Sequence, residues 1–98
     1  MLFAFIGKDN PGVLQLRIDT RSPHVAFLET LNAEGTLKFA GPFLDDEGNP
    51  NGSLVVVEAA DKEKAAEILA GDPYAKAGLF AETEIRQWRW TFNQPKGV

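Results

Sequence analysis

Cysteine is absent from this 98-residue chain, and histidine, tyrosine and methionine occur once each. Without cysteine the protein has no disulfide, no thiolate nucleophile and no cysteine-based metal site. With one histidine we expect no bound metal, and ligation by carboxylates alone is the alternative that stays open. No cofactor motif is present, so we expect no cofactor. The lack of cysteine suits a reducing compartment, and we expect a cytoplasmic protein.

Basic side chains and long apolar runs are also scarce. Ten Lys and Arg residues stand against 14 Asp and Glu residues, which gives a net charge of −4. An acidic surface repels phosphate backbones, so we expect no nucleic-acid partner. No apolar run approaches the ~20 residues of a membrane helix, and the N-terminus lacks the basic region of a signal peptide. The length fits a single domain over residues 1–98, with a loose tail over 93–98.

Six segments carry the patterns of regular secondary structure. Apolar and β-branched runs predict strands over 2–7, 36–44, 53–60 and 82–92. Helical spacing of apolar residues predicts one helix over 23–34 and a second between its cap Asp61 and Gly71. The order strand, helix, strand, strand, helix, strand is typical of the ferredoxin-like α+β fold, βαββαβ. We therefore expect a four-stranded antiparallel sheet with two main helices on one face.

The first predicted helix has clear boundary signals. Ser22 is a preferred N-cap, and Pro23 suits the first helical position, where its missing N–H is unpaired anyway. Gly35 is the expected left-handed residue after the helix end. We expect residues 13–20 to be an irregular first part of this helical segment.

The predicted strands are apolar on both sides. Leu2, Ala4 and Ile6 alternate with Phe3 and Phe5, whereas a sheet with one face in water should alternate apolar and polar residues. Three aromatic residues share one face of the last predicted strand: Trp88, Trp90 and Phe92. A monomer would expose a large apolar patch, which marks an interface. We expect a homodimer that pairs these sheet faces; the alternative is a face covered by loops or by the C-terminal tail.

The single histidine, His24, falls at the second position of the predicted helix. There the positive end of the helix dipole disfavours imidazolium, so we expect a neutral ring near pH 7 that can act as a base. His24 also shares a helical stripe with Phe27, Leu28 and Leu31, which directs it toward the sheet. A lone histidine near a helix start is often only a packed, hydrogen-bonded core or cap residue, and from position alone this structural interpretation is favoured.

Asp72 lies between a helix-ending glycine and Pro73, a position typical of an N-cap. A carboxylate can also orient a catalytic histidine. Nothing in the spacing shows that Asp72 meets His24. Arg17 and Arg21 fit a surface role by default, with binding of a carboxylate as the alternative.

Several short pieces of the chain follow one another in a distinctive order. They are MLFAFIGKD at the N-terminus, RSPHVAFLETL around His24, the strand end AGP, the strand start Gly52-Ser53, and GDPYAKAGLF around Asp72. Together they resemble the YCII-related family across nearly the whole chain. The resemblance implies a ferredoxin-like fold within the dimeric α/β-barrel superfamily and an active site built on His24 and Asp72. One branch of that family is associated with dehydrochlorination of chlorinated hydroxyquinols. The segment IRQWRWTF departs from the proline-aromatic ending of the family, which leaves the shape of the site rim or interface open.

Three functional hypotheses follow. In the first, His24 is a general acid or base, oriented by Asp72, in a cofactor-free, lyase-like enzyme that acts on a small aromatic or enolisable compound. The second is a non-catalytic dimeric module that binds a small ligand or supports a partner enzyme. In the third, both residues are only helix caps. The candidate substrate-binding residues come from the expected pocket wall and from the resemblance: Arg21, Gly41, Pro42, Ser53 and Tyr74.

Overall fold

The computed structural model describes residues 1–96, so residues 97 and 98 of the predicted tail lie outside the described residues. Its elements are, in order, β1 (Leu2–Asp9), α1 (Leu14–Ala33), β2 (Leu37–Leu44), β3 (Pro50–Glu58), α2 (Lys62–Ala70), α3 (Pro73–Lys76) and β4 (Phe80–Trp88). Apart from the short α3, this is the predicted βαββαβ order, and the α+β fold is confirmed. None of the helices described here is both long enough and apolar enough to span a bilayer.

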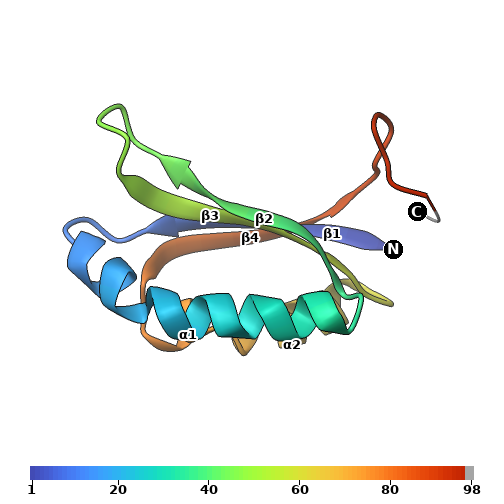
Figure 1. The fold of residues 1–98 in the computed structure, drawn as a ribbon, viewed down its shortest axis with the longest axis horizontal. Coiled ribbons are helices and arrows are strands. Elements are labelled where there is room, and N and C mark those ends of the chain that lie inside the picture. The colour runs from blue at the N-terminus through green and yellow to red at the C-terminus, as the bar shows by residue number, and fades with distance from the viewer. Residues whose placement is uncertain (97–98) are drawn as a thin grey trace.

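The four strands form one antiparallel sheet in the order β2-β3-β1-β4. α1 and α2 both lie on one face of this sheet, and none of the helices formed by residues 1–96 covers the opposite face (Figure 1). β2 is an edge strand, which accommodates Pro42 because an edge residue can lack the N–H that a central ladder needs. The fold therefore has two layers, and its functional side chains come from the space between them or from the open sheet face.

The main core fills the layer between the helices and the sheet. Alternate strand residues supply one side of it, because successive side chains of a strand point to opposite faces. Its buried members are Phe3, Phe5, Leu31, Val55, Val57, Ala59, Ala65 and Leu69. Phe27 and Leu28 pack against this core together with Leu31, so the predicted inward stripe of α1 is confirmed.

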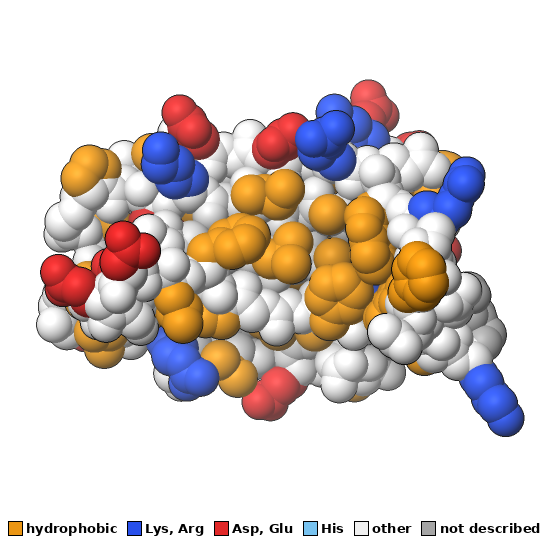
Figure 2. Space-filling model, turned by 90° about the horizontal axis from the view of Figure 1, so that it is seen from above, with side chains coloured by type: hydrophobic (Ala, Val, Ile, Leu, Met, Phe, Trp, Pro, Cys, Tyr) orange, Lys and Arg blue, Asp and Glu red, His pale blue; other side chains and the backbone are white. Residues whose placement is uncertain are grey.

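The face away from the helices carries a second apolar cluster. Its buried members are Leu2, Ala4 and Val56, and Phe39, Leu54 and Trp90 pack around them. Figure 2 looks onto this face and shows apolar side chains gathered across its middle. The apolar character of both sheet faces is therefore confirmed. Trp90 lies beyond β4, so the C-terminal segment covers part of the open face.

The start of α1 differs from the prediction. The helix begins at Leu14, so Ser22 is not its N-cap and Pro23 lies in its interior. An interior proline lacks the N–H for one helical hydrogen bond, and it bends a helix without ending it when tertiary packing holds both sides. Figure 1 shows the first turns of α1 inclined to the rest. The helix ends as predicted, with Gly35 in the left-handed region at φ +79°.

The predicted end of the last strand is also wrong. β4 covers Phe80–Trp88 rather than residues 82–92, so Trp88, Trp90 and Phe92 do not share the face of one strand. The partner strand β1 begins at Leu2, directly opposite Trp88, so the ladder between the two strands stops at this pair. Trp90 instead donates a hydrogen bond from Nε1 to the backbone oxygen of Phe92 at 2.7 Å.

Candidate active site

His24 lies in the middle of α1 and is mostly buried. Its Nδ1 is 2.8 Å from Oδ1 of Asp72, and the two side chains are 11% and 3% exposed. The fold therefore brings two residues into hydrogen-bond contact that are 48 positions apart in the chain. Because α1 begins at Leu14, the expectation that this ring sits at the positive end of a helix dipole is wrong.

Asp72 binds two partners through one oxygen. Its Oδ1 meets His24 and also accepts the backbone N–H of Tyr74 at 2.9 Å, which makes Asp72 the N-cap of α3. The predicted cap is confirmed. A capping carboxylate is held in place by the helix end, because turning away would leave a backbone donor unpaired. The capping bond therefore also fixes the position of the oxygen that faces His24.

The contact with Asp72 determines the tautomer of the imidazole. An ionised carboxylate only accepts hydrogen bonds, so the hydrogen on Nδ1 points to Asp72 and a neutral ring carries its lone pair on Nε2. Within residues 1–96, no fully buried side-chain nitrogen or oxygen lacks a hydrogen-bond partner. The one side-chain hydrogen bond of His24 in that range is the one at Nδ1. It follows that Nε2 is not sealed in the core, and His24 lines the cavity described next.

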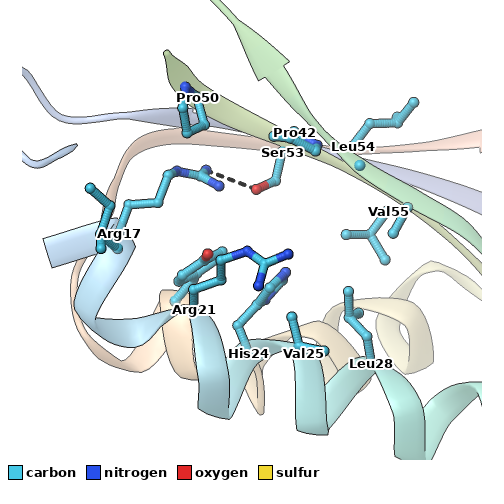
Figure 3. A pocket seen from close by; sticks show the side chains of 14 residues that line it. Arg17, Arg21, His24, Val25, Leu28, Pro42, Pro50, Ser53, Leu54 and Val55 are labelled. Carbon is cyan, nitrogen blue, oxygen red and sulfur yellow. Dashed lines mark hydrogen bonds between the residues drawn. The ribbon is translucent and has the colours of Figure 1, made fainter. Parts of the chain in front are cut away.

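A cavity of about 270 Å³ opens between α1 and the β2–β3 side of the sheet, as Figure 3 shows from close by. Small-molecule pockets usually start at roughly 300 Å³, so this cavity suits a ligand with a single ring. All five candidate substrate-binding residues line it: Arg21, Gly41, Pro42, Ser53 and Tyr74. His24 lines it too, whereas Asp72 is not among its lining residues.

Tyr74 packs against His24 at the wall of the cavity. The two rings are stacked, with centroids 3.8 Å apart and planes inclined by 16°. The guanidinium carbon of Arg17 lies 4.7 Å from the centroid of the same tyrosine ring. Burial raises the pKa of the Tyr74 hydroxyl, against the opposing effect of Arg17 and Arg21. The phenol therefore keeps its proton at neutral pH and can donate a hydrogen bond.

Arg17 is buried, so the surface role expected for it is wrong. Its Nε and Nη2 donate to the two carboxylate oxygens of Asp9 at 2.7 and 2.9 Å, and Nη2 also donates to Oγ of Ser53 at 2.9 Å. Burial disfavours the cation, but the Asp9 carboxylate and Tyr74 together outweigh this effect, so the pKa of Arg17 is raised. A two-bonded arginine–carboxylate pair has a fixed geometry, so Arg17 is a rigid donor at this end of the cavity.

Arg21 is exposed, yet its side chain extends over the cavity beside His24 (Figure 3). No ion pair or hydrogen bond joins its side chain to another residue in the range 1–96. Its charge is therefore uncompensated at the cavity mouth. In the same part of the chain, no three histidine, aspartate or glutamate side chains gather in a way that could hold a metal ion.

Comparison with known proteins places this architecture in a family. The YCII-related domain matches residues 1–89. The chain belongs to the YCII-related family. An uncharacterised protein of Haemophilus influenzae is 33% identical, over 94% of this chain and 100% of its own length. Protein YciI of Escherichia coli is 31% identical, over 94% of this chain and 100% of its own length.

A solved structure is also similar to this chain. It is 5-chloro-2-hydroxyhydroquinone dehydrochlorinase (TftG) from Burkholderia phenoliruptrix, in complex with 2,5-dihydroxybenzoquinone. Its sequence is 38% identical and its TM-score is 0.81, over 91% of this chain and 94% of the other. The resemblance seen in the sequence is therefore confirmed, and so is the fold that it implied.

Two residues at the site of this YCII-related chain escaped the sequence analysis as site residues: Asp9 and Arg17. The signal that would have found Arg17 is its spacing, because residues 17, 21 and 24 follow the i, i+4, i+7 pattern of one helix face. A helix that starts at Pro23 excludes residue 17 from this face, so the local start signal masks the pattern. Asp9, at the end of β1, has no local pattern that points to its partner.

Proposed function

We propose that this protein is a cofactor-independent general acid/base enzyme, lyase-like in its chemistry, that acts on a small aromatic or enolisable compound. One observation carries the proposal: His24 lines the cavity, and its Nδ1 lies 2.8 Å from Oδ1 of Asp72. A neutral imidazole held in this way is a base whose lone pair faces the ligand. A positioned general base contributes roughly 10²- to 10⁴-fold in rate.

The proton transfer has a simple balance. Nε2 of His24 takes a proton from a C–H or O–H bond of the ligand, and the electron pair of that bond stays on the ligand as an enolate or phenolate. Asp72 stabilises the imidazolium that forms, as a carboxylate does for a catalytic histidine. Arg21, whose charge is uncompensated at the cavity mouth, favours the anion that results. A leaving group on the same ring can then depart with the electron pair.

The size of the cavity and one relative support a small oxygenated ring as the substrate class. The cavity of about 270 Å³ has room for one ring with its substituents. The similar dehydrochlorinase was solved with 2,5-dihydroxybenzoquinone and is named for its action on 5-chloro-2-hydroxyhydroquinone. These two compounds are therefore the first ligand and the first substrate to test on this chain.

The test is chloride release from 5-chloro-2-hydroxyhydroquinone by the wild-type protein and by His24→Ala. We expect the variant to lose about 100-fold or more in kcat while it keeps the far-ultraviolet circular dichroism of the fold. Equal activity in the two proteins would rule out His24 as the base. Binding of the quinone without turnover, unchanged between pH 5 and pH 8, would instead indicate a non-catalytic ligand-binding module.

We also propose that the functional unit is a homodimer joined through the open sheet face. The apolar cluster around Leu2, Ala4 and Val56 supports this, because apolar side chains gathered on one face favour association (Figure 2). A second copy would bury this cluster with the same residues on both sides, which is the arrangement of a two-fold interface.

A further inference from the structure

The hydroxyl of Ser53 accepts one hydrogen bond from the protein. Nη2 of Arg17 lies 2.9 Å from Oγ of Ser53, and a guanidinium can only donate hydrogen bonds. Ser53 therefore accepts from Arg17, and its own hydrogen must go to another acceptor. No protein acceptor for that hydrogen occurs in the described part of the chain, and Ser53 lines the cavity. The hydrogen is thus available to a ligand.

The direction of this donor is fixed by groups that cannot move freely. Asp9 holds the guanidinium of Arg17 through two bonds, and both side chains of that pair are 5% exposed. Ser53 is itself 3% exposed and sits in the ladder between β1 and β2. The neighbouring Gly52 approaches β1 so closely that an added Cβ would lie 2.7 Å from the backbone oxygen of Gly7. The strand that carries Ser53 is therefore packed tightly against β1.

We propose that the Asp9–Arg17 pair turns Ser53 into a fixed hydrogen-bond donor, so that this end of the cavity selects ligands with a carbonyl or anionic oxygen. The inference rests on the cavity of the proposed function and names the part of the ligand that the cavity recognises. Asp9 and Arg17 are positioning residues, and Ser53 touches the ligand. Arg21 also lines the cavity, and its positive charge favours ligands with an anionic oxygen as well.

The cavity then offers a ligand one hydrogen-bond donor and one hydrogen-bond acceptor. Ser53 offers a donor at one place, and Nε2 of neutral His24 offers an acceptor at another. A ligand fits both when it presents an oxygen acceptor to Ser53 and an acidic hydrogen to His24. When that hydrogen leaves as a proton, negative charge grows on the ligand oxygen, and the bond from Ser53 strengthens with it. A ligand of the same shape without the oxygen leaves the buried donor unpaired.

The test compares the affinity of Ser53→Ala and wild-type protein for 2,5-dihydroxybenzoquinone by isothermal titration calorimetry. We expect about 10- to 100-fold weaker binding, as for loss of a hydrogen bond to a charged ligand. Ser53→Thr keeps the hydroxyl and should keep the affinity within about threefold of the wild type by the same argument. Ser22→Ala makes the same change on an exposed position outside the cavity and should leave binding unaltered.

Arg17→Lys provides a second test of the same proposal. Lysine keeps the charge but lacks the planar fork, so it cannot bind Asp9 and Ser53 together. We expect it to weaken quinone binding as Ser53→Ala does. If it fails to fold, the Ser53→Ala and Ser53→Thr pair still decides.

Two outcomes would overturn the inference: equal affinity of Ser53→Ala and wild type, or no binding of the quinone by the wild type. Neither depends on turnover. If the wild type binds the quinone and Ser53→Ala weakens that binding, but the wild type releases no chloride, the inference stands and the proposed enzyme is contradicted.

Discussion

At the residue scale, Asp72 joins two roles that the sequence left as alternatives. One oxygen both caps α3 through the N–H of Tyr74 and contacts His24. Capping and orientation are therefore one arrangement, and removing the side chain would disturb both at once. A substitution that keeps the cap and removes the charge separates the two roles.

Asp72→Asn is that substitution. Asparagine caps helices about as well as aspartate, so the free energy of unfolding should change by less than about 1 kcal/mol. The neutral amide no longer stabilises an imidazolium and can impose the other tautomer, so kcat should fall by about 10²- to 10⁴-fold. Chemical denaturation and the chloride-release assay measure the two effects.

The matched control for this prediction is Asp61→Asn. Asp61 caps α2 by accepting from the N–H of Lys64 at 2.8 Å, and it does not line the cavity. The substitution Asp61→Asn should leave both the free energy of unfolding and kcat nearly unchanged. If Asp72→Asn behaves in the same way, Asp72 is a cap and nothing more.

At the element scale, the bend in α1 matters for the site because the helix supplies residues on both sides of it. Arg17 precedes Pro23 and reaches Asp9 and Ser53 at the sheet. His24 follows Pro23 and reaches Asp72. A straight helix would aim these two side chains in directions set by one axis, whereas a bent helix allows each half to face its own partner.

Pro23→Ala tests the value of the bend. Alanine restores the missing helical hydrogen bond and is the best helix former, so the free energy of unfolding should rise by about 1–3 kcal/mol. The straighter helix should move Arg17 away from Ser53 and weaken quinone binding several-fold. Thermal unfolding and calorimetric titration check the two parts. A more stable variant with unaltered affinity would show that the bend does not position Arg17.

At the scale of the whole molecule, the open sheet face carries the proposal of a homodimer. The main core is complete within one chain, whereas the second cluster is covered from one side only by Trp90 and its neighbours. Trp90, which precedes the predicted tail of residues 93–98, covers part of the face, and apolar side chains gather across its middle (Figure 2). The pairing of this face in a homodimer stays a prediction.

Ile6→Lys should convert the proposed dimer to a monomer. Ile6 is half-buried, shares the parity of Leu2 and Ala4 on the open face, and pairs across the strands with Glu84. A lysine there can pair with that glutamate in a monomer, whereas two copies facing each other would bury the charge. Light scattering should report twice 10.7 kDa for the wild type and 10.7 kDa for the variant.

The control for the Ile6→Lys experiment is Ala26→Lys, which adds the same charge at an exposed position of α1. It should leave the dimer intact. A wild-type protein that is monomeric at micromolar concentration would contradict the dimer, and the enzyme proposal would then have to stand on a single chain.

The sequence by itself determined the features that depend on near neighbours. Asp61 and Asp72 were identified as caps because a cap bonds to an N–H two or three residues ahead of it. The strands and their order followed from apolar runs, and the two apolar faces followed from the alternation of side chains along each strand. Each of these rests on contacts whose geometry a short stretch of backbone already defines.

Only the tertiary structure decided the extent of α1 and the composition of the site. Pro23 is locally a helix start, but the packing of both halves of α1 outweighs the one hydrogen bond that it removes. The bonds from His24 to Asp72 and from Arg17 to Ser53 join residues 48 and 36 positions apart. No local pattern encodes such distances, because they are set by how the helices dock on the sheet, through burial of side chains from the whole chain at once.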